Sequence, residues 1–344
     1  MQRRDLSRAL FASAAGVALL PKNAEAATCP AGPCYPVSAA EVAVGVAPTN
    51  YQYPPGNVLR YGATGNGSTP DDAAFTQAIA CNDLVIVPDP PNYFSAPASN
   101  FYLFSKTVNL RSGVTLRGAN RSTTIIKPAT SLGVSAPVFL GTNLAHVTIE
   151  NLGIVMPNSG YDQYALQFNG ELQYSTIQNN YIIGPSGPSP DHIGIYLASG
   201  TGADIYSGGV LIDNNTIFNV RLGIVLGGSN TTVRVTRNTL DVGGTTPSSY
   251  GTVGVDLGPQ CTGVLIEGNQ ITGWIEGIYS QGGYIRQIGN YFEGNSNDWY
   301  WVQGAGNSGV WNSSIGDINP GQAGLNNYPS NTGCIVLGQG WLTY

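Results

Sequence analysis

Short apolar segments recur at a nearly regular spacing along the chain from residue 140 onward. One line of repeats reads ALQF, GIYL, GIVL, GVDL and GIYS, and these start at Ala165, Gly194, Gly223, Gly254 and Gly277. The starts are separated by 29, 29, 31 and 23 residues. A period in this range is typical of a solenoid, in which one repeat forms one coil that buries its apolar face only against its neighbours.

A second line of repeats carries an asparagine in a V/I-x-x-N-x-I pattern. The asparagine follows the aligned start of the coil by 15 residues in three coils. An asparagine that recurs directly after a short strand is expected to bond the coils above and below it, so we predict an internal ladder. The members of this line are Asn151, Asn180, Asn215, Asn238, Asn269 and Asn290.

The apolar segments span only three to six residues and are rich in Val, Ile and Thr. Segments of this length and composition suit strands and are too short for helices. The sequence therefore predicts an all-β chain in which stacked strands form parallel sheets around a filled core. The residues expected in this core are Ile195, Leu197, Ile224, Leu226, Val255 and Leu257.

Ahead of the repeats, the stretch RYGATGNGSTPDDAAFTQAIA predicts a glycine-rich turn that leads into a short helix over residues 70–80. Ser68 or Thr69 suits the N-cap, and Pro70 suits the first turn because its missing N–H has no helical partner there. The glycine spacing matches neither a Walker loop nor a dinucleotide-binding fingerprint. A structural role for this turn is therefore favoured over phosphate binding.

The same stretch resembles the N-terminal motif YGAxGDGxTDDTxAIQxAI of the pectate-lyase-like superfamily. The resemblance implies a single right-handed parallel β-helix over nearly the whole mature chain, with the helix at residues 70–80 covering its N-terminal end. The superfamily includes pectate lyases, polygalacturonases, epimerases and phage depolymerases, so the fold alone does not decide the reaction. The motif is matched at Tyr61, Gly62, Ala63, Gly65, Gly67 and Thr69 and is departed from at Asn66 and Pro70.

The first 26 residues have the composition of an export signal. Arg3 and Arg4 precede an uncharged stretch over residues 9–20, and Ala24-Glu25-Ala26 offers an A-x-A cleavage site. The segment RRDLSRALF resembles a twin-arginine signal, although two arginines also suit an ordinary secretory peptide. We expect a periplasmic or secreted protein with an N-terminal extension over residues 27–57 and one β-helix domain over residues 58–344.

The charge of the chain argues against a nucleic-acid partner. Removing residues 1–26 takes away four basic and two acidic residues, so the formal net charge changes from −6 to −8. Phosphate neutralisation needs clustered Lys and Arg. No later segment has 18 consecutive uncharged apolar residues, so no membrane span is expected. The oligomeric state is left open.

Five cysteines suit an oxidising compartment, where disulfides form. Cys29 and Cys34 are close enough in sequence to close a local loop, and we predict that they pair. Cys81, Cys261 and Cys334 have no partner that the sequence assigns.

One outward-facing set of residues suits β-elimination on a uronic acid sugar. If strict alternation continues along the GIYL segment, His192 and Tyr196 point away from the core. Arg221 takes the position of His192 in the next coil, and Asp256 lies two coils from Tyr196. Arg221 would neutralise the substrate carboxylate, His192 or Tyr196 would remove the neighbouring proton, and Tyr196 would protonate the leaving oxygen. His192 also follows the Pro-rich stretch GPSGPSPD, so a plain surface-loop position is the alternative.

Paired carboxylates offer inverting glycoside hydrolysis as a second possibility, with Asp256 and either Glu276 or Asp241 as the pair. Glu276 has the inward parity of Ile278, so it has to lie in a turn to take part. Other side chains on the same face would contact the sugar, and the tryptophans near the end of the chain have end packing as an alternative. The expected substrate-binding residues are Gln167, Tyr279 and Trp274, with Trp299 and Trp301 as further exposed aromatics.

The sequence lacks the catalytic motifs of polygalacturonases and alginate epimerases, and it holds no His, Cys and Asp cluster with metal-ligand spacing. We therefore expect neither a cofactor nor a metal. The outward set favours a lyase acting on a polysaccharide or oligosaccharide over a hydrolase. A non-catalytic carbohydrate-binding or envelope-structural β-helix is the third possibility.

Overall fold

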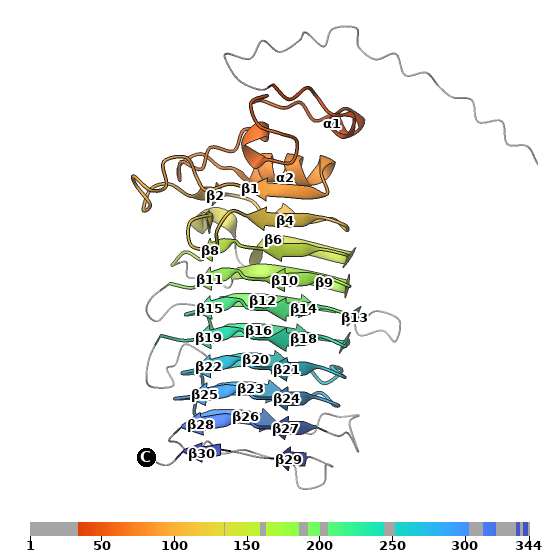
Figure 1. Cartoon of the computed structure of the whole chain (residues 1–344), viewed down its shortest axis with the longest axis vertical. Helices are drawn as coiled ribbons and strands as arrows, with labels where there is room; N and C mark the ends of the chain where they lie inside the picture. Colours follow the sequence, from red (N-terminus) through yellow and green to blue (C-terminus); the bar gives the residue numbers. More distant parts are fainter. Residues whose placement is uncertain are drawn as a thin grey trace, which may run out of the picture.

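Three parallel sheets wind around one long axis. The computed structural model describes residues 34–133, 135–158, 163–185, 192–199, 206–243, 252–302, 312–320, 335–337 and 340–342. Each sheet has ten strands, and successive coils extend all three sheets in parallel, so the chain forms a right-handed parallel β-helix (Figure 1). The fold predicted from the repeats is confirmed.

The strands fall into sheets that we name A, B and C. Sheet A contains β1 (Leu84–Val87), β4 (Thr115–Gly118), β7 (Thr148–Glu150), β10 (Thr176–Gln178), β14 (Leu211–Asp213), β18 (Arg234–Thr236), β21 (Leu265–Glu267), β24 (Arg286–Ile288), β27 (Ser313–Ile315) and β29 (Ile335–Leu337). Sheet B contains β2 (Tyr102–Phe104), β5 (Ile125–Pro128), β8 (Gly153–Val155), β11 (Tyr181–Ile183), β15 (Thr216–Phe218), β19 (Thr239–Asp241), β22 (Gln270–Thr272), β25 (Tyr291–Glu293), β28 (Ile318–Pro320) and β30 (Gly340–Leu342). Sheet C contains β3 (Val108–Asn109), β6 (Ala136–Ala145), β9 (Gln163–Gln173), β12 (Ile193–Ala198), β13 (Ser207–Gly208), β16 (Leu222–Gly227), β17 (Asn230–Thr231), β20 (Val253–Leu257), β23 (Glu276–Ser280) and β26 (Asn297–Trp301).

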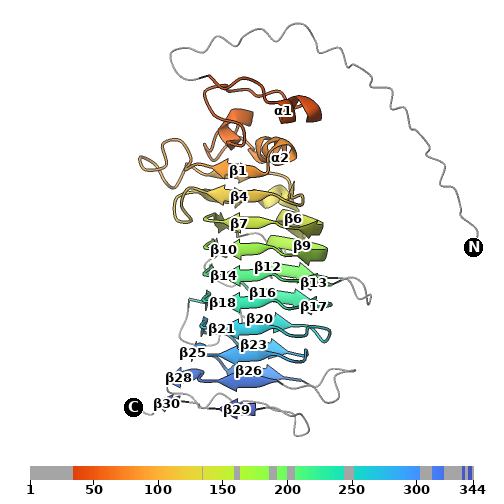
Figure 2. The same ribbon diagram turned by 45° about the vertical axis from the view of Figure 1, so that its right-hand side comes forward.

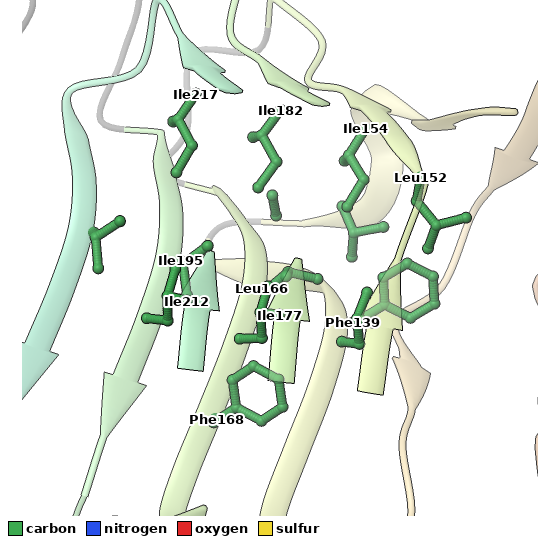
Figure 3. Close-up of a cluster of buried hydrophobic side chains, with 14 of the residues drawn as sticks. Phe139, Leu152, Ile154, Leu166, Phe168, Ile177, Ile182, Ile195, Ile212 and Ile217 are labelled. Carbon is green, nitrogen blue, oxygen red and sulfur yellow. The ribbon is translucent and has the colours of Figure 1, made fainter. Parts of the chain in front are cut away.

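The interior is filled by apolar side chains that stack in register from coil to coil (Figure 3). Val, Ile and Leu suit this arrangement because they pack closely against the same residue type one coil away. In sheet C, for example, Ile195 pairs with Leu166 on one side and Ile224 on the other. All six predicted core residues are fully buried, which confirms the prediction for Ile195, Leu197, Ile224, Leu226, Val255 and Leu257.

Asparagines line the turn between sheets A and B. In each case the Nδ2 group donates to the Oδ1 atom of the next asparagine at 3.0 Å, and the backbone N–H donates to the same oxygen. The row ends on Asp317, whose Oδ1 accepts both groups of the last asparagine at 2.6 and 3.1 Å. The predicted ladder is confirmed for Asn180, Asn215, Asn238, Asn269 and Asn290, all of which are buried.

Asn151 does not belong to this row, and its predicted place is wrong. The interior position of its coil is occupied by Leu152, whose backbone N–H donates to Asn180 Oδ1 at 3.1 Å. Asn151 lies one residue earlier, at a positive φ of 60°, and its side chain accepts from Asn179 on the outside of the turn. The repeat pattern alone therefore does not show which of two adjacent turn positions, both able to carry asparagine, faces inward.

Helix α2 (Asp72–Cys81) closes the N-terminal end of the coil, in agreement with the predicted helix over residues 70–80 (Figures 1 and 2). Its Phe75 packs edge-on against Tyr102 and Phe104 of the first coil, with ring centroids 5.3 and 4.8 Å apart. The N-cap is Asp71 rather than Ser68 or Thr69. The Asp71 carboxylate instead accepts backbone N–H groups of Thr64 and Leu103, which ties the glycine turn to β2.

The segment before this cap is fastened to it by a buried ion pair. Helix α1 (Ala39–Val44) supplies Glu41, and the 3-10 helix η1 (Val58–Tyr61) supplies Arg60; a second 3-10 helix, η2 (Thr130–Leu132), lies in the second coil. Arg60 Nε donates to Glu41 Oε1 at 2.6 Å, and both side chains are fully buried. Burial opposes ionisation of Glu41, but hydrogen bonds from Arg60, the Ser38 backbone and Tyr61 hold its pKa at about 2. Such a pair stabilises only while both partners are present.

Candidate active site

One outward-facing row crosses sheet C from coil to coil. The strand register places Asp256 two coils from Tyr196 and directly beside Tyr279, with Gln167 on the other side of Tyr196. The predicted alignment of these four residues is therefore confirmed. We call this set the outer row, and it consists of Leu140, Gln167, Tyr196, Val225, Asp256, Tyr279 and Tyr300.

A column of glycines runs beside the outer row, formed by Gly194, Gly223, Gly254 and Gly277. A Cβ atom on the first three would meet the carbonyl oxygen of the next glycine at 2.5, 2.4 and 2.6 Å, and one on Gly277 would meet the Asp298 carbonyl oxygen at 2.7 Å. No side chain fits at such distances, and the strand register skips the glycines. Strict alternation is thereby interrupted, and the residues before three of the glycines, namely Ile193, Leu222 and Glu276, are partly exposed.

Glu276 gains its outward position from this interruption. It is the first residue of β23 and precedes Gly277, and it is half-buried rather than enclosed in the core. The inward parity predicted from Ile278 is therefore wrong. Burial raises the pKa of the Glu276 carboxyl, and the nearby negative charge of Asp256 raises it further. Two carboxylates on adjacent coils thus influence each other on one face.

Asp256 lies among register neighbours that carry no charge. Val225 and Tyr279 occupy the same register position in the coils before and after it. No hydrogen bond or ion pair joins its carboxylate to another side chain within the part of the chain that the structure describes. Burial alone raises the pKa of Asp256 to about 6, because removal of water disfavours the ionised form.

His192 does not reach this face, so its predicted outward orientation is wrong. Its backbone oxygen accepts the Arg221 N–H at 2.9 Å, which confirms that the two residues occupy adjacent coils. The imidazole, however, is fully buried, and Nε2 lies 2.9 Å from the Pro157 carbonyl oxygen. Because a carbonyl can only accept, Nε2 carries the proton. The error arises from the glycine column, which reverses the parity between His192 and Tyr196.

The predicted exposure of Trp274 is also wrong. Its ring is fully buried, and Nε1 donates to the Leu240 carbonyl oxygen at 3.1 Å. The tip of the ring lies against Gly223, where a Cβ would come within 3.5 Å of it. The indole therefore fills space that the glycine column leaves open. Trp299 and Trp301 are buried in the last described coils with ring centroids 6.3 Å apart, which agrees with end packing and not with sugar stacking.

The remaining two charged candidates lie away from the outer row. Arg221 is half-buried in the turn before β16. Asp241 ends β19 in sheet B, and its Oδ1 accepts the Gly243 N–H at 2.8 Å. An aspartate that bonds its own turn in this way has a structural use, so Glu276 is the better partner for Asp256.

Two tyrosine stacks flank the acidic residues. Tyr164 stacks on Tyr196 with ring centroids 5.5 Å apart, and Tyr279 stacks on Tyr300 at 5.7 Å. The Tyr279 hydroxyl accepts a hydrogen bond from Gln281 Nε2 at 2.6 Å. Sequence reasoning missed Tyr164 and Tyr300. Tyr300 was not recognised as a member of the repeat because the sequence of its coil is NDWYW, with an aspartate where the other coils have glycine.

Comparison with protein families agrees with the fold and assigns the chain to a family. The family model described as "Rhamnogalacturonase A/epimerase, pectate lyase-like" matches residues 56–279, which is more than half of the chain. The chain belongs to this family. The superfamily resemblance read from the N-terminal motif is thereby confirmed, and the matched range ends at Tyr279, so it includes both carboxylates of the outer face of sheet C.

Individual relatives of this rhamnogalacturonase A/epimerase-like chain are distant. A glucan 1,3-beta-glucosidase of Cochliobolus carbonum is 32% identical over 169 residues, covering 42% of this chain and 21% of that protein. The chain thus spans about a fifth of the length of this curated relative. The pre-mature gene product 12 of bacteriophage phi29 has 13% identity and a TM-score of 0.56, covering 82% of this chain and 45% of that one. At this identity the likeness shows the fold alone.

Two further observations bear on what this family member binds. Among the residues that the structure describes, no three His, Cys, Asp or Glu side chains gather where they could hold a metal ion. The helices within the same residues are all too short or too polar to cross a membrane.

Proposed function

We propose that the protein is a glycoside hydrolase that cleaves a polysaccharide with Asp256 and Glu276. The observation that carries the proposal is the pairing of these carboxylates on adjacent coils of sheet C, flanked by tyrosines. The family model, whose description names rhamnogalacturonase A and epimerase, supports a carbohydrate substrate. The name of the fungal relative, a glucan 1,3-beta-glucosidase, also supports glycoside hydrolysis.

The two carboxylates suit different roles. Asp256, with a pKa of about 6, is protonated in mildly acidic solution and acts as the general acid that protonates the leaving oxygen. Glu276 acts as the base that activates water. Adjacent strands lie about 4.8 Å apart, and Glu276 is displaced from the partner of Asp256 by three residues, or roughly 10 Å along the strand. The two offsets together separate the backbone positions by roughly 11 Å. Side chains that lean toward each other would reach the spacing of inverting enzymes, about 6.5–9.5 Å, before the spacing of about 5 Å in retaining enzymes.

The lyase predicted from sequence is less well supported. That reaction needs His192 or Tyr196 as its base, but His192 is buried and bonded to the Pro157 carbonyl oxygen. Tyr196 remains on the outer face, and Arg221 directly precedes the neighbouring strand β16. Elimination would therefore depend on Tyr196 as both base and acid, whereas hydrolysis has two carboxylates for the two roles.

A substrate screen tests the proposal. Purified protein is incubated with a panel of neutral and uronate polymers, and new reducing ends and unsaturated products are measured separately. Hydrolysis by Asp256 and Glu276 yields reducing ends without unsaturation. Unsaturated products would contradict the proposal and favour the lyase, and no product from a broad panel would favour the non-catalytic binding protein.

We also propose export through the leader over residues 1–26, which lies outside the described residues. Cys34 is disulfide-bonded, and this supports an oxidising compartment. Its predicted partner, Cys29, lies outside the described residues, while Cys81 and Cys261 are buried free thiols. Cell fractionation with N-terminal sequencing tests the leader, and export that survives replacement of Arg3 and Arg4 by lysine would favour an ordinary secretory peptide over a twin-arginine signal.

A further inference from the structure

We infer that the outer face of sheet C binds an uncharged glycan and selects against polyuronates. The inference rests on the proposed function, since it names the substrate class of the same site. It starts from the distribution of cations, which separates sheet C from the other two sheets.

The strands of sheet C contain no lysine or arginine at any position. Sheet A carries Arg117, Arg234 and Arg286, and sheet B carries Lys127. Recognition of a carboxylate sugar calls for such side chains, because arginine and lysine supply its charge-assisted hydrogen bonds.

Lys106 and Arg111 flank β3 at the N-terminal end of sheet C, and Arg111 pairs there with Asp83. Beyond β3, the segments that connect the strands add few cations. Residues 128–344 contain only four basic residues, against thirteen acidic ones. Arg234 and Arg286 belong to sheet A, and Arg237 pairs with Asp213. Arg221, in the turn before β16, is therefore the one basic residue of this part of the sequence that lies beside sheet C.

Sheet C also carries acidic side chains, in addition to lacking cations. Glu171 of β9 is partly exposed, and Asp256 and Glu276 lie on the same side of the sheet. A polyuronate carries one carboxylate per sugar and would bring several of these against the three acids. Like charges that meet at a partly desolvated surface repel strongly, and the acidic surroundings extend the repulsion beyond direct contact.

The polar groups of the outer row suit hydroxyl partners instead. Gln167 donates to Asn169 Oδ1 at 3.0 Å, and Gln281 donates to the Tyr279 hydroxyl at 2.6 Å. Amide and phenol groups both donate and accept, as sugar hydroxyls do, and they remain neutral at physiological pH. The internal bonds also hold them in place before a ligand arrives, which reduces the entropy lost on binding.

Binding of matched hexasaccharides to the full-chain Asp256→Asn variant tests the inference. Calorimetry at low and high salt compares neutral hexamers of 1,3- and 1,4-linked glucose with hexagalacturonate and hexamannuronate. We expect at least one neutral hexamer to bind tenfold or more tightly than either uronate at low salt. The difference in affinity between neutral and uronate hexamers should become smaller at high salt, because salt screens repulsion between exposed charges. The substitution removes one negative charge, so it biases the test toward the uronates.

A cation introduced into the row provides a second measurement. Gln167→Lys should raise hexagalacturonate affinity several-fold, whereas Thr176→Lys on the outer face of sheet A should leave it unchanged. Uronate binding equal to or tighter than neutral binding, or no binding of any hexamer, would overturn the inference. Turnover is measured separately on the wild-type protein. If a neutral hexamer binds but no neutral glycan is cleaved, the proposed hydrolase is rejected and the inferred ligand class stands. If a polyuronate is hydrolysed, the hydrolase stands and the inferred ligand class is rejected.

Discussion

Sheets A and C share parallel strands and coil-to-coil register, yet the carboxylates of the two sheets have opposite surroundings. On sheet A, Glu150 accepts from Arg117 in the neighbouring coil. Asp213 accepts likewise from Arg237 in the next coil. On sheet C, the register neighbours of Asp256 are Val225 and Tyr279, which carry no charge.

The pKa values follow this difference. Burial raises the pKa of Asp213, but hydrogen bonds from Arg237 and Thr236 outweigh it and leave the pKa below the ordinary value. Burial acts on Asp256 without such opposition and raises its pKa to about 6. The residue one coil away therefore decides the character of the carboxyl group. A neighbouring arginine keeps the group ionised in a structural ion pair, and an uncharged neighbour leaves it with a raised pKa that suits acid catalysis.

The largest effect is expected on catalysis. Asp256→Asn keeps the shape of the side chain but removes the exchangeable proton, so the rate of glycan cleavage should fall about a thousandfold or more. Reducing-end assays on the substrate found in the screen measure this. Asp213→Asn is the matched variant on sheet A and should retain most of the activity. Comparable losses in both variants would show that the two faces do not differ in function.

The interior row tests whether the two faces share one scaffold. Asn238→Ala removes a buried amide that donates to Asn269 and accepts from Asn215, and this should lower the free energy of unfolding by about 1–3 kcal/mol. Denaturant unfolding measures the change, with Asn215→Ala expected to behave alike. The outward-facing Thr239→Ala is the control and should stay within about 0.5 kcal/mol. Unchanged stability in both asparagine variants would mean that these amides do not hold the coils together.

The pH-dependent effects on stability should have opposite signs on the two faces. The folded-state pKa of Asp256 is raised from 3.8 to about 6, so its contribution to stability is lost as pH rises through that range. Asp256→Asn should therefore be more stable than wild type at pH 7.5, by roughly 1–3 kcal/mol, and equal to it near pH 4. The pKa of Asp213 is lowered, so its contribution is present above the ordinary value and is lost as pH falls.

Asp213→Asn should accordingly reduce the melting temperature at pH 7.5, and the difference should shrink in acid. Thermal melts of both variants across this pH range provide the measurement. A shift of the same sign in both variants would contradict the assigned environments.

The sequence was sufficient for the coil and its core because both depend on periodicity. A strand that is buried against the same strand of the next coil repeats its apolar residues in register, and the GIYL line records this directly. The asparagine ladder was visible for the same reason. Asn151 was misplaced because each of these turns has two adjacent positions that can carry an asparagine, and only the contact of Leu152 with Asn180 shows that the second position faces inward.

The site was predicted only in part because side-chain direction depends on a local irregularity. Alternation correctly placed Tyr196 and Asp256 outside. Alternation failed for His192 and Glu276, because a glycine of the column separates each of them from the outer-row residue of its strand. A side chain at each glycine position would clash with a carbonyl oxygen of the neighbouring coil, and the in–out alternation of side chains is interrupted there. Four glycines in one register position are a sequence signal for such close contact between coils.

Trp274 shows a second limit of sequence reasoning. An indole in a turn suggests a sugar platform, but this one occupies space beside Gly223 that exists only because the glycines have no side chains. The partners of a buried tryptophan can lie one or two coils away, as Leu240 and Gly223 do here, and no local sequence pattern shows this.

The asparagine row also decides what any inserted coil has to supply at this position. One Nδ2–H of each asparagine donates to the asparagine of the next coil, and the other donates to a backbone carbonyl oxygen of the preceding coil. Its Oδ1 atom accepts from the asparagine before it, and the row ends at Asp317, whose Oδ1 accepts from Asn290. A coil transplanted into this stack would therefore need a side chain that donates in both directions along the axis and accepts from its predecessor. A single carboxamide meets all three demands, and an aliphatic side chain of similar size meets none of them.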